Sequence, residues 1–144
     1  MTGALAGLRV VEIAGDIAGP YCAKLLVDLG AEVTKVEPPF GDPLRRWGPF
    51  PGGVEDPDRS GLFEYLNAGK CGATIDLDGD VSAVRDLIAH ADLIIDGMPP
   101  GVLDNPATSL AVMAEHLRGY SGSLTFSARA EGGTRACVRW QSAW

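Results

Sequence analysis

The apolar and polar positions along the chain alternate in blocks that predict strands and helices in turn. A nearly continuous apolar run over residues 8–14, rich in β-branched side chains, is typical of a strand buried on both faces of a parallel sheet. Pro20 suits the first turn of a helix, and apolar residues at helical spacing lead from it to Gly30, which suits the position just after a helix. Residues 32–37 alternate in polarity and stop at two prolines, so they predict a second strand.

The same alternation continues to about residue 127 and predicts an α/β fold: a mostly parallel sheet with helices on both faces. A polar loop rich in Gly and Pro, residues 38–61, interrupts it, and loops of this length are usually functional. The segment 128–144 has neither a strand nor a helix period, so we expect an irregular tail or a shifted reading frame there. The further expected elements are a helix over 62–66, a strand over 73–77, a helix capped by Asp80, a strand over 93–95, a helix over 110–117 and a strand over 124–126.

Composition narrows the class of protein. The chain has 144 residues, 46% of them hydrophobic and 22% charged, which suits one soluble globular domain. Its net charge of −7 argues against a nucleic-acid partner. Three cysteines without a CxxC pair indicate free thiols in a reducing compartment, and two lone histidines offer no metal site. With no signal peptide and no apolar run long enough for a bilayer, a cytoplasmic protein without membrane contact is expected.

The loop over residues 15–19 joins the end of a strand to the start of a helix, where backbone N–H groups can bind a phosphate. Its Gly-x-x-x-Gly spacing matches neither the dinucleotide fingerprint nor a P-loop, and Asp16 would repel a phosphate that it faced. Glu37, at the end of the second strand, could serve as the ribose-binding acid of an NAD enzyme. A tight turn without a ligand is the alternative.

Two further places could bind phosphate or another ligand. Lys70 stands in a glycine-containing turn, and Arg45 and Arg46 stand side by side in the long loop. The turn over residues 97–103 follows a strand at the edge where open α/β sheets bind ligands. Solvent-exposed loop residues and a rigid turn are the alternatives.

Taken together and in order, these segments resemble the class III CoA-transferases, the formyl-CoA transferase and carnitine CoA-transferase family. The resemblance covers roughly residues 4–127. It is carried by Leu5-x-Gly-Leu-Arg-Val-Val-Glu12, Ala18-Gly-Pro20, Leu29-Gly-Ala-Glu-Val-x-Lys-Val-Glu-Pro-Pro39, Gly41-Asp-Pro43, Asn67-x-Gly-Lys70 and Pro100-Gly-Val-Leu103.

The resemblance implies the N-terminal part of a CoA-transferase with a Rossmann-like sheet, incomplete relative to the family, whose members are more than twice as long. It implies transfer of coenzyme A between an acyl-CoA and a carboxylic acid through a catalytic aspartate, in a homodimer. That aspartate has no counterpart here, so we expect no catalytic residue and an inactive polypeptide. The implied CoA-binding residues are Ile17, Ala18, Pro38, Lys70, Ile75, Asp76, Leu77, Asp78, Gly97, Met98, Pro99 and Asn105.

Departures from the family pattern leave alternatives open. Pro38 and Asn105 stand where members carry arginines that contact phosphate, which would weaken CoA binding. A fragment of the family's α-methylacyl-CoA racemase branch is a second interpretation. A nucleotide- or CoA-binding module without chemistry, which self-associates, is a third.

Overall fold

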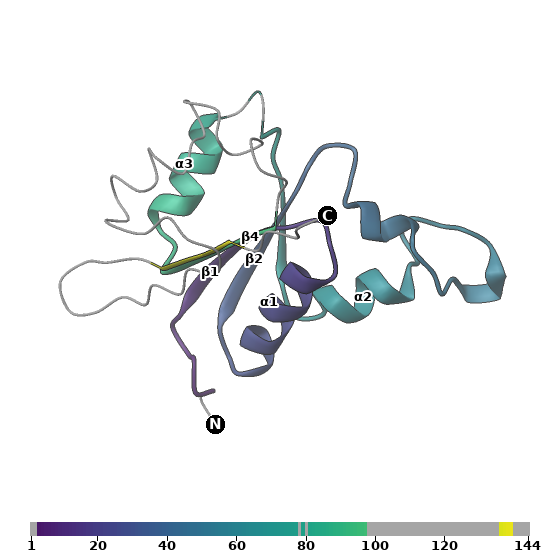
Figure 1. Ribbon diagram of the computed structural model, residues 1–144, viewed down its shortest axis with the longest axis horizontal. Helices are drawn as coiled ribbons and strands as arrows, with labels where there is room; N and C mark the ends of the chain where they lie inside the picture. The colour runs from purple at the N-terminus through teal and green to yellow at the C-terminus, as the bar shows by residue number, and fades with distance from the viewer. Residues whose placement is uncertain (1–2, 78, 80, 98–135, 140–144) are drawn as a thin grey trace.

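A computed structural model describes residues 3–77, 79, 81–97 and 136–139 (Figure 1). In this part of the chain five strands pair in parallel to form one sheet, in the order β3-β2-β1-β4-β5. The strands are β1 (Arg9–Ile13), β2 (Glu32–Glu37), β3 (Cys71–Thr74), β4 (Leu93–Asp96) and β5 (Ala136–Arg139). The helices are α1 (Ala18–Asp28), α2 (Gly61–Asn67) and α3 (Val81–Ala89), with short 3-10 helices η1 (Pro43–Arg46) and η2 (Pro51–Gly53).

Helices cover both faces of the sheet, with α1 and α2 on one face and α3 on the other (Figure 1). Alternate residues of β1 accordingly enter two apolar cores, Val10 on the α1 face and Val11 on the α3 face. This arrangement confirms the expected α/β, Rossmann-like fold. The α1 core is Val10, Ala23, Ala31, Val33 and Ile95, and the α3 core is Val11, Ile13, Val36, Ile88, Ala91 and Ile94.

Two element boundaries differ from the expected ones. Helix α1 begins at Ala18 rather than Pro20, because the carboxylate of Asp16 accepts the N–H of Gly19 and satisfies the first turn. Strand β3 covers residues 71–74 instead of 73–77, because its register is set by β2 and two prolines that lack N–H donors follow β2.

The other expectations divide into confirmed and untested ones. Helix α2 and strand β4 confirm the helix over 62–66 and the strand over 93–95. Asp80 and the elements expected over 110–117 and 124–126 lie outside the described residues. Strand β5 lies inside the segment expected to be irregular. It is a strand because it pairs with β4, and pairing with a distant segment cannot be recognised from the periodicity of the β5 sequence itself. The domain boundary at residue 127 remains a prediction.

No helix in the described ranges is both long and apolar enough to cross a membrane. Because every strand pair is parallel, the carboxyl ends of the strands lie at one edge of the sheet. The strand order reverses between β1 and β4, and at such a reversal the loops leave toward opposite faces and open a ligand-binding crevice. The candidate site is therefore at the carboxyl ends of β1 and β4.

Candidate functional site

The loops that leave β1 and β4 are in direct contact at this reversal point. The N–H of Gly97 donates a hydrogen bond of 2.9 Å to the carbonyl of Ile13. A Cβ atom placed on Gly97 would lie only 2.7 Å from Cβ of Ala14, and one placed on Gly19 would also collide with Ala14. Glycine is therefore required at both positions by close packing, which brings the start of α1 against the end of β4.

The start of α1 combines exposed apolar side chains with a carboxylate that binds one of its amides. Asp16 Oδ1 accepts the Gly19 N–H at 3.0 Å, so the negative carboxylate already occupies the N-terminal end of the helix. A phosphate placed there would meet this charge. Ile17 is 46% exposed and Ala18 is also exposed, so the surface suits an uncharged part of a ligand.

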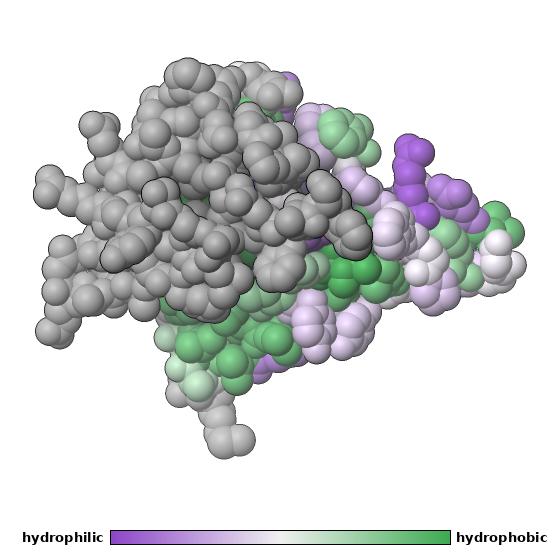
Figure 2. All heavy atoms as spheres, in the orientation of Figure 1, coloured by the Kyte–Doolittle hydropathy of each residue, from purple (hydrophilic) through white to green (hydrophobic). Residues whose placement is uncertain are grey.

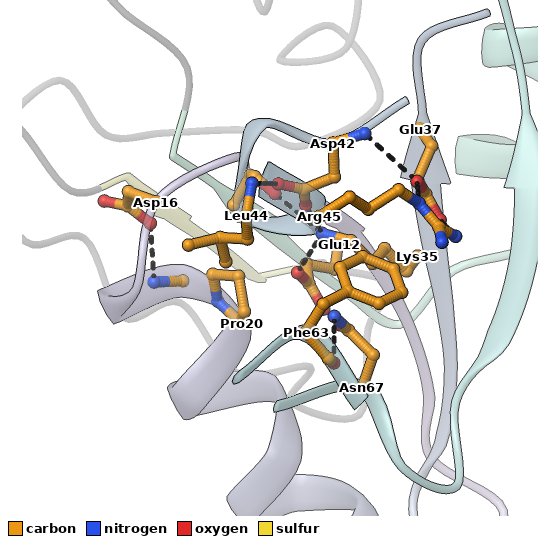
Figure 3. A network of polar contacts seen from close by, with 12 residues as sticks. Glu12, Asp16, Pro20, Lys35, Glu37, Asp42, Leu44, Arg45, Phe63 and Asn67 are labelled. Carbon is orange, nitrogen blue, oxygen red and sulfur yellow. Dashed lines mark hydrogen bonds and ion pairs between the residues drawn. The ribbon is translucent and has the colours of Figure 1, made fainter. Parts of the chain in front are cut away.

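Four charged side chains, those of Glu12, Lys35, Asp42 and Lys70, lie buried beneath this loop, on the α1 side of the sheet. Figure 3 shows the first three of them. Glu12 Oε1 lies 3.0 Å from Lys35 Nζ, and Glu12 Oε2 lies 2.6 Å from Lys70 Nζ. Lys35 Nζ also lies 2.6 Å from Asp42 Oδ2, at an angle outside hydrogen-bond geometry, so this contact is an ion pair. Their side chains are at most 2% exposed. Two positive and two negative charges balance, which buried ions require.

Both ammonium groups also bind backbone carbonyls of the loop. Lys35 Nζ donates to the carbonyl of Ala14 at 2.8 Å, and Lys70 Nζ donates to the carbonyl of Pro20 at 2.9 Å. The third donor of Lys70 reaches Asn67 Oδ1 at 3.0 Å. Burial lowers the pKa of Lys70, although the charge of Glu12 and its hydrogen bond oppose the shift. All three donors of Lys70 are thus engaged inside the protein, and contact with a phosphate would require it to leave them.

Glu37 is engaged in a second ion pair at the end of β2. Its two carboxylate oxygens accept hydrogen bonds of 2.7 and 2.9 Å from Arg45, whose guanidinium stacks 3.9 Å above the ring of Phe63. Burial raises the pKa of Glu37, but the hydrogen bonds from Arg45 and the Asp42 amide outweigh it, so the pKa is lowered. Three of the roughly four acceptor positions of the Glu37 carboxylate are thus filled, so a ribose would compete with Arg45 and the Asp42 amide for it. Arg46, next to Arg45, is exposed.

The structure brings most of the sequence-predicted residues that it describes to one edge of the sheet. Ile17 and Ala18 follow β1, Pro38 follows β2, residues 75–77 follow β3 and Gly97 follows β4. Of these, Asp76 is exposed, and Pro38, Ile75, Leu77 and Gly97 are half-buried. Asp78, Met98, Pro99 and Asn105 lie outside the described residues. Among the described side chains no group of His, Cys, Asp and Glu could hold a metal ion.

The sequence interpretation missed the residues beneath the loop, namely Glu12, Lys35, Asp42 and Asn67. A signal for two of them was present. Glu12 stands between Val11 and Ile13 in an apolar run, and Lys35 stands between Val33 and Val36 in a strand rich in valine. A charge inside a buried strand requires a partner, so each of these residues implied the other.

Comparison with known proteins supports the family expected from the sequence. The sequence model of "CoA-transferase family III" matches residues 5–118. Succinyl-CoA:mesaconate CoA-transferase of Haloarcula hispanica is 36% identical over 116 residues, which are 79% of this chain and 29% of that one. The BbsE subunit of succinyl-CoA:(R)-benzylsuccinate CoA-transferase of Thauera aromatica is 43% identical over 98 residues, which are 67% of this chain and 24% of that one.

A solved structure gives the same result. The crystal structure of a CaiB/BaiF family protein from Brucella suis superposes with a TM-score of 0.63 and 39% identity, over 72% of this chain and 28% of that one. The chain therefore spans less than a third of the length of these relatives.

The parallel sheet and its reversed strand order define a Rossmann-like α/β protein, a class in which ligands bind at the carboxyl edge of the sheet. Within this class the chain belongs to CoA-transferase family III.

Proposed function

We propose that these residues form the CoA-binding part of an enzyme that moves coenzyme A between an acyl-CoA and a carboxylic acid. The observation that carries the proposal is the convergence of the loops after β1, β2, β3 and β4 on one edge, within the part of the chain that matches the family. Two of the relatives compared above are named succinyl-CoA:mesaconate CoA-transferase and succinyl-CoA:(R)-benzylsuccinate CoA-transferase subunit BbsE.

The local chemistry supports a division of this edge between parts of the ligand. Exposed Ile17 and Ala18 offer apolar contact, and Asp16 opposes a phosphate at the start of α1. The pantetheine arm of CoA is uncharged, so it suits this position better than the phosphates do. We place the adenine near the loop after β3, at residues 75–77, which are half-buried or exposed. Pro38, Gly97 and the predicted residues outside the described part complete the proposed site.

We propose that the 144-residue polypeptide by itself binds CoA and does not transfer it, because the family's catalytic aspartate has no counterpart among its residues. Isothermal titration with CoA, with NAD as control ligand, tests the binding, and an exchange assay with succinyl-CoA and a free acid tests the transfer. Saturable binding of CoA but not NAD supports the proposal. Binding of neither ligand, or turnover in the exchange assay, contradicts it.

A matched pair of variants tests the location of the site. Ile17→Gln removes an exposed apolar side chain at the ligand edge, and should weaken CoA binding about fivefold, or roughly 1 kcal/mol. Val54→Gln makes the same kind of change at a residue that is 71% exposed and directly follows η2. It should leave the affinity unchanged. Equal effects of the two variants would contradict the placement.

We also propose that the polypeptide forms homodimers. Apolar side chains that are about half exposed recur every four residues along α1, at Ile17, Tyr21, Leu25 and Leu29. Figure 2 shows apolar surface over the part of the molecule that contains α1. Light scattering over a range of concentrations should show the mass rising toward twice that of the chain. A constant monomer mass would contradict the dimer.

A further inference from the structure

Two buried lysines meet the loop after β1 from below, one at each end. Lys35, from β2, binds the carbonyl of Ala14, where the loop begins, and Lys70, from the turn after α2, binds the carbonyl of Pro20, in the first turn of α1 that follows the loop. Glu12 lies between the two ammonium groups and contacts each of them through a different oxygen. The segment that carries the proposed CoA contacts is therefore linked to Glu12 at two points, through Lys35 at Ala14 and through Lys70 at Pro20.

Each lysine contacts three partners, and the two sets of partners are of the same kinds. One partner is Glu12 and one is a loop carbonyl. The third belongs to another element: Asp42 of the 38–61 loop for Lys35, and Asn67 of α2 for Lys70. All three contacts of Lys70 are hydrogen bonds, which match the three donors of an ammonium group, whereas Lys35 makes two hydrogen bonds and one ion pair. Each lysine thereby ties the loop to β1 and to a neighbouring element.

Charge balance alone does not explain these lysines. Burying an ammonium group costs several kcal/mol, and apolar residues of similar size often replace buried ion pairs without loss of stability. An apolar side chain could not donate to the carbonyls of Ala14 and Pro20, however. The feature that only lysine supplies is a set of directed hydrogen bonds to the backbone of the loop.

We propose that Lys35 and Lys70 are positioning residues for the CoA site, which hold residues 14–20, the loop after β1 with the first turn of α1, in their binding conformation through the carbonyls of Ala14 and Pro20. The expected effect on CoA affinity rests on the proposed function. The geometry of the loop can be tested without any ligand.

A pair of variants separates positioning from charge balance. Lys70→Met leaves the cluster with one cation, Lys35, for the two anions Glu12 and Asp42. Both the thermal stability and the CoA affinity should therefore fall. The double variant Glu12→Met/Lys70→Met restores neutrality, because Lys35 and Asp42 remain as a pair. It should regain thermal stability. It should still bind CoA about tenfold more weakly than the unaltered chain, as when the loop holds its binding conformation one tenth of the time.

Lys35 allows the same design with a different partner. Lys35→Met/Asp42→Asn also keeps the cluster neutral, because Glu12 and Lys70 remain paired at 2.6 Å. The asparagine side chain can keep the oxygen that accepts the N–H of Leu44. We expect this double variant to be more stable than Asp42→Asn alone, and still to bind CoA more weakly than the unaltered chain. Lys24→Met is the control, since it removes a lysine paired with Asp28 farther along α1 and should leave CoA affinity unchanged.

Amide hydrogen exchange supplies a readout that does not depend on CoA. The N–H of Gly19 is bound to Asp16 and that of Tyr21 to the carbonyl of Ile17. Both amides should exchange several-fold faster in the two neutral double variants than in the unaltered chain, and at the unaltered rate in Lys24→Met.

The outcomes separate the two hypotheses. Stable double variants that regain full CoA affinity and loop protection would overturn the inference, because charge balance would then be the only role of the lysines. If the unaltered chain binds no CoA, the proposed function fails, and the exchange rates still decide the positioning role. If Lys70→Met does not fold, the neutral double variants alone carry the comparison.

Discussion

Close packing between the loops after β1 and β4 makes Gly97→Ala a quantitative test of the site's architecture. The added Cβ would lie 2.7 Å from Cβ and 3.3 Å from Cα of Ala14, which is itself only 4% exposed. Carbon atoms in ordinary contact are about 3.5–4.0 Å apart, so the shorter contact falls short by about 1 Å. Because Ala14 is buried and directly follows β1, it cannot retreat without moving the end of that strand, so we expect real strain.

The size of the effect follows from this overlap. Inserting a methyl group into a packed site costs roughly 1–3 kcal/mol, so Gly97→Ala should lower the free energy of unfolding by about 2 kcal/mol. Ala14→Gly removes a buried methyl group, about 0.8 kcal/mol, and adds backbone freedom, about 0.5–1 kcal/mol, so it should cost roughly 1.5 kcal/mol. In the double variant the clash is absent. Its loss should therefore fall short of the sum of the single losses by about 1–2 kcal/mol.

Urea unfolding of the four proteins in this cycle measures the coupling directly. Gly72→Ala serves as a control, since a Cβ there meets nothing within 4 Å, and it should change stability by less than about 0.5 kcal/mol. Additive losses at positions 14 and 97, or a neutral Gly97→Ala, would refute the close approach of the two loops. The proposed crevice at the strand reversal would then have a different shape.

Three further predictions concern charge and thiol chemistry. The pKa of Glu37 is lower in the folded than in the unfolded chain, so its stabilisation is present above about pH 4.3 and is lost as the pH falls through the folded value. Urea unfolding should show that Glu37→Gln costs stability near pH 7 and much less near pH 2. Asp42→Asn leaves a buried lysine underpaired and should cost about 3–5 kcal/mol in the same assay, while Asp58→Asn, whose side chain is 92% exposed, should cost less than about 0.5 kcal/mol. Iodoacetamide should alkylate exposed Cys71 at least about tenfold faster than Cys22, because burial and the charge of Glu12 raise the pKa of the Cys22 thiol, as peptide mass spectrometry would show.

The elements that sequence patterns predicted well are those whose apolar residues meet a core within the described part. Val10 and Val11 face opposite sides of the sheet, so an unbroken apolar run correctly indicated a doubly covered strand. Strand β3 was placed with wrong boundaries because it lies next to β2 alone among the described strands, and its register comes from that pairing. Local patterns cannot contain such a register.

Charged residues were harder to interpret than apolar ones. A lysine in a turn such as Lys70 is usually solvated, and nothing near it in sequence shows that Glu12, 58 residues away, lies 2.6 Å from its ammonium group. The same holds for Arg45, whose guanidinium is taken by Glu37 and by the ring of Phe63. Only the three-dimensional arrangement distinguishes a cation free to bind phosphate from one already neutralised.

On the α1 face of the sheet, apolar pairs give way to charged pairs along the strands. This order suggests that the apolar residues mainly stabilise the fold, whereas the charged residues mainly position the loop. At one level Val10 pairs with Val33 in the apolar core, and two residues farther on Glu12 pairs with Lys35 in the buried charge cluster. The apolar level contributes burial without requiring exact geometry, whereas the charged level requires directed partners. Because the charged level lies next to the loop of the proposed site, substitutions at Val10 and Val33 should mainly change stability. Substitutions that keep Glu12 and Lys35 charge-balanced should mainly change ligand affinity.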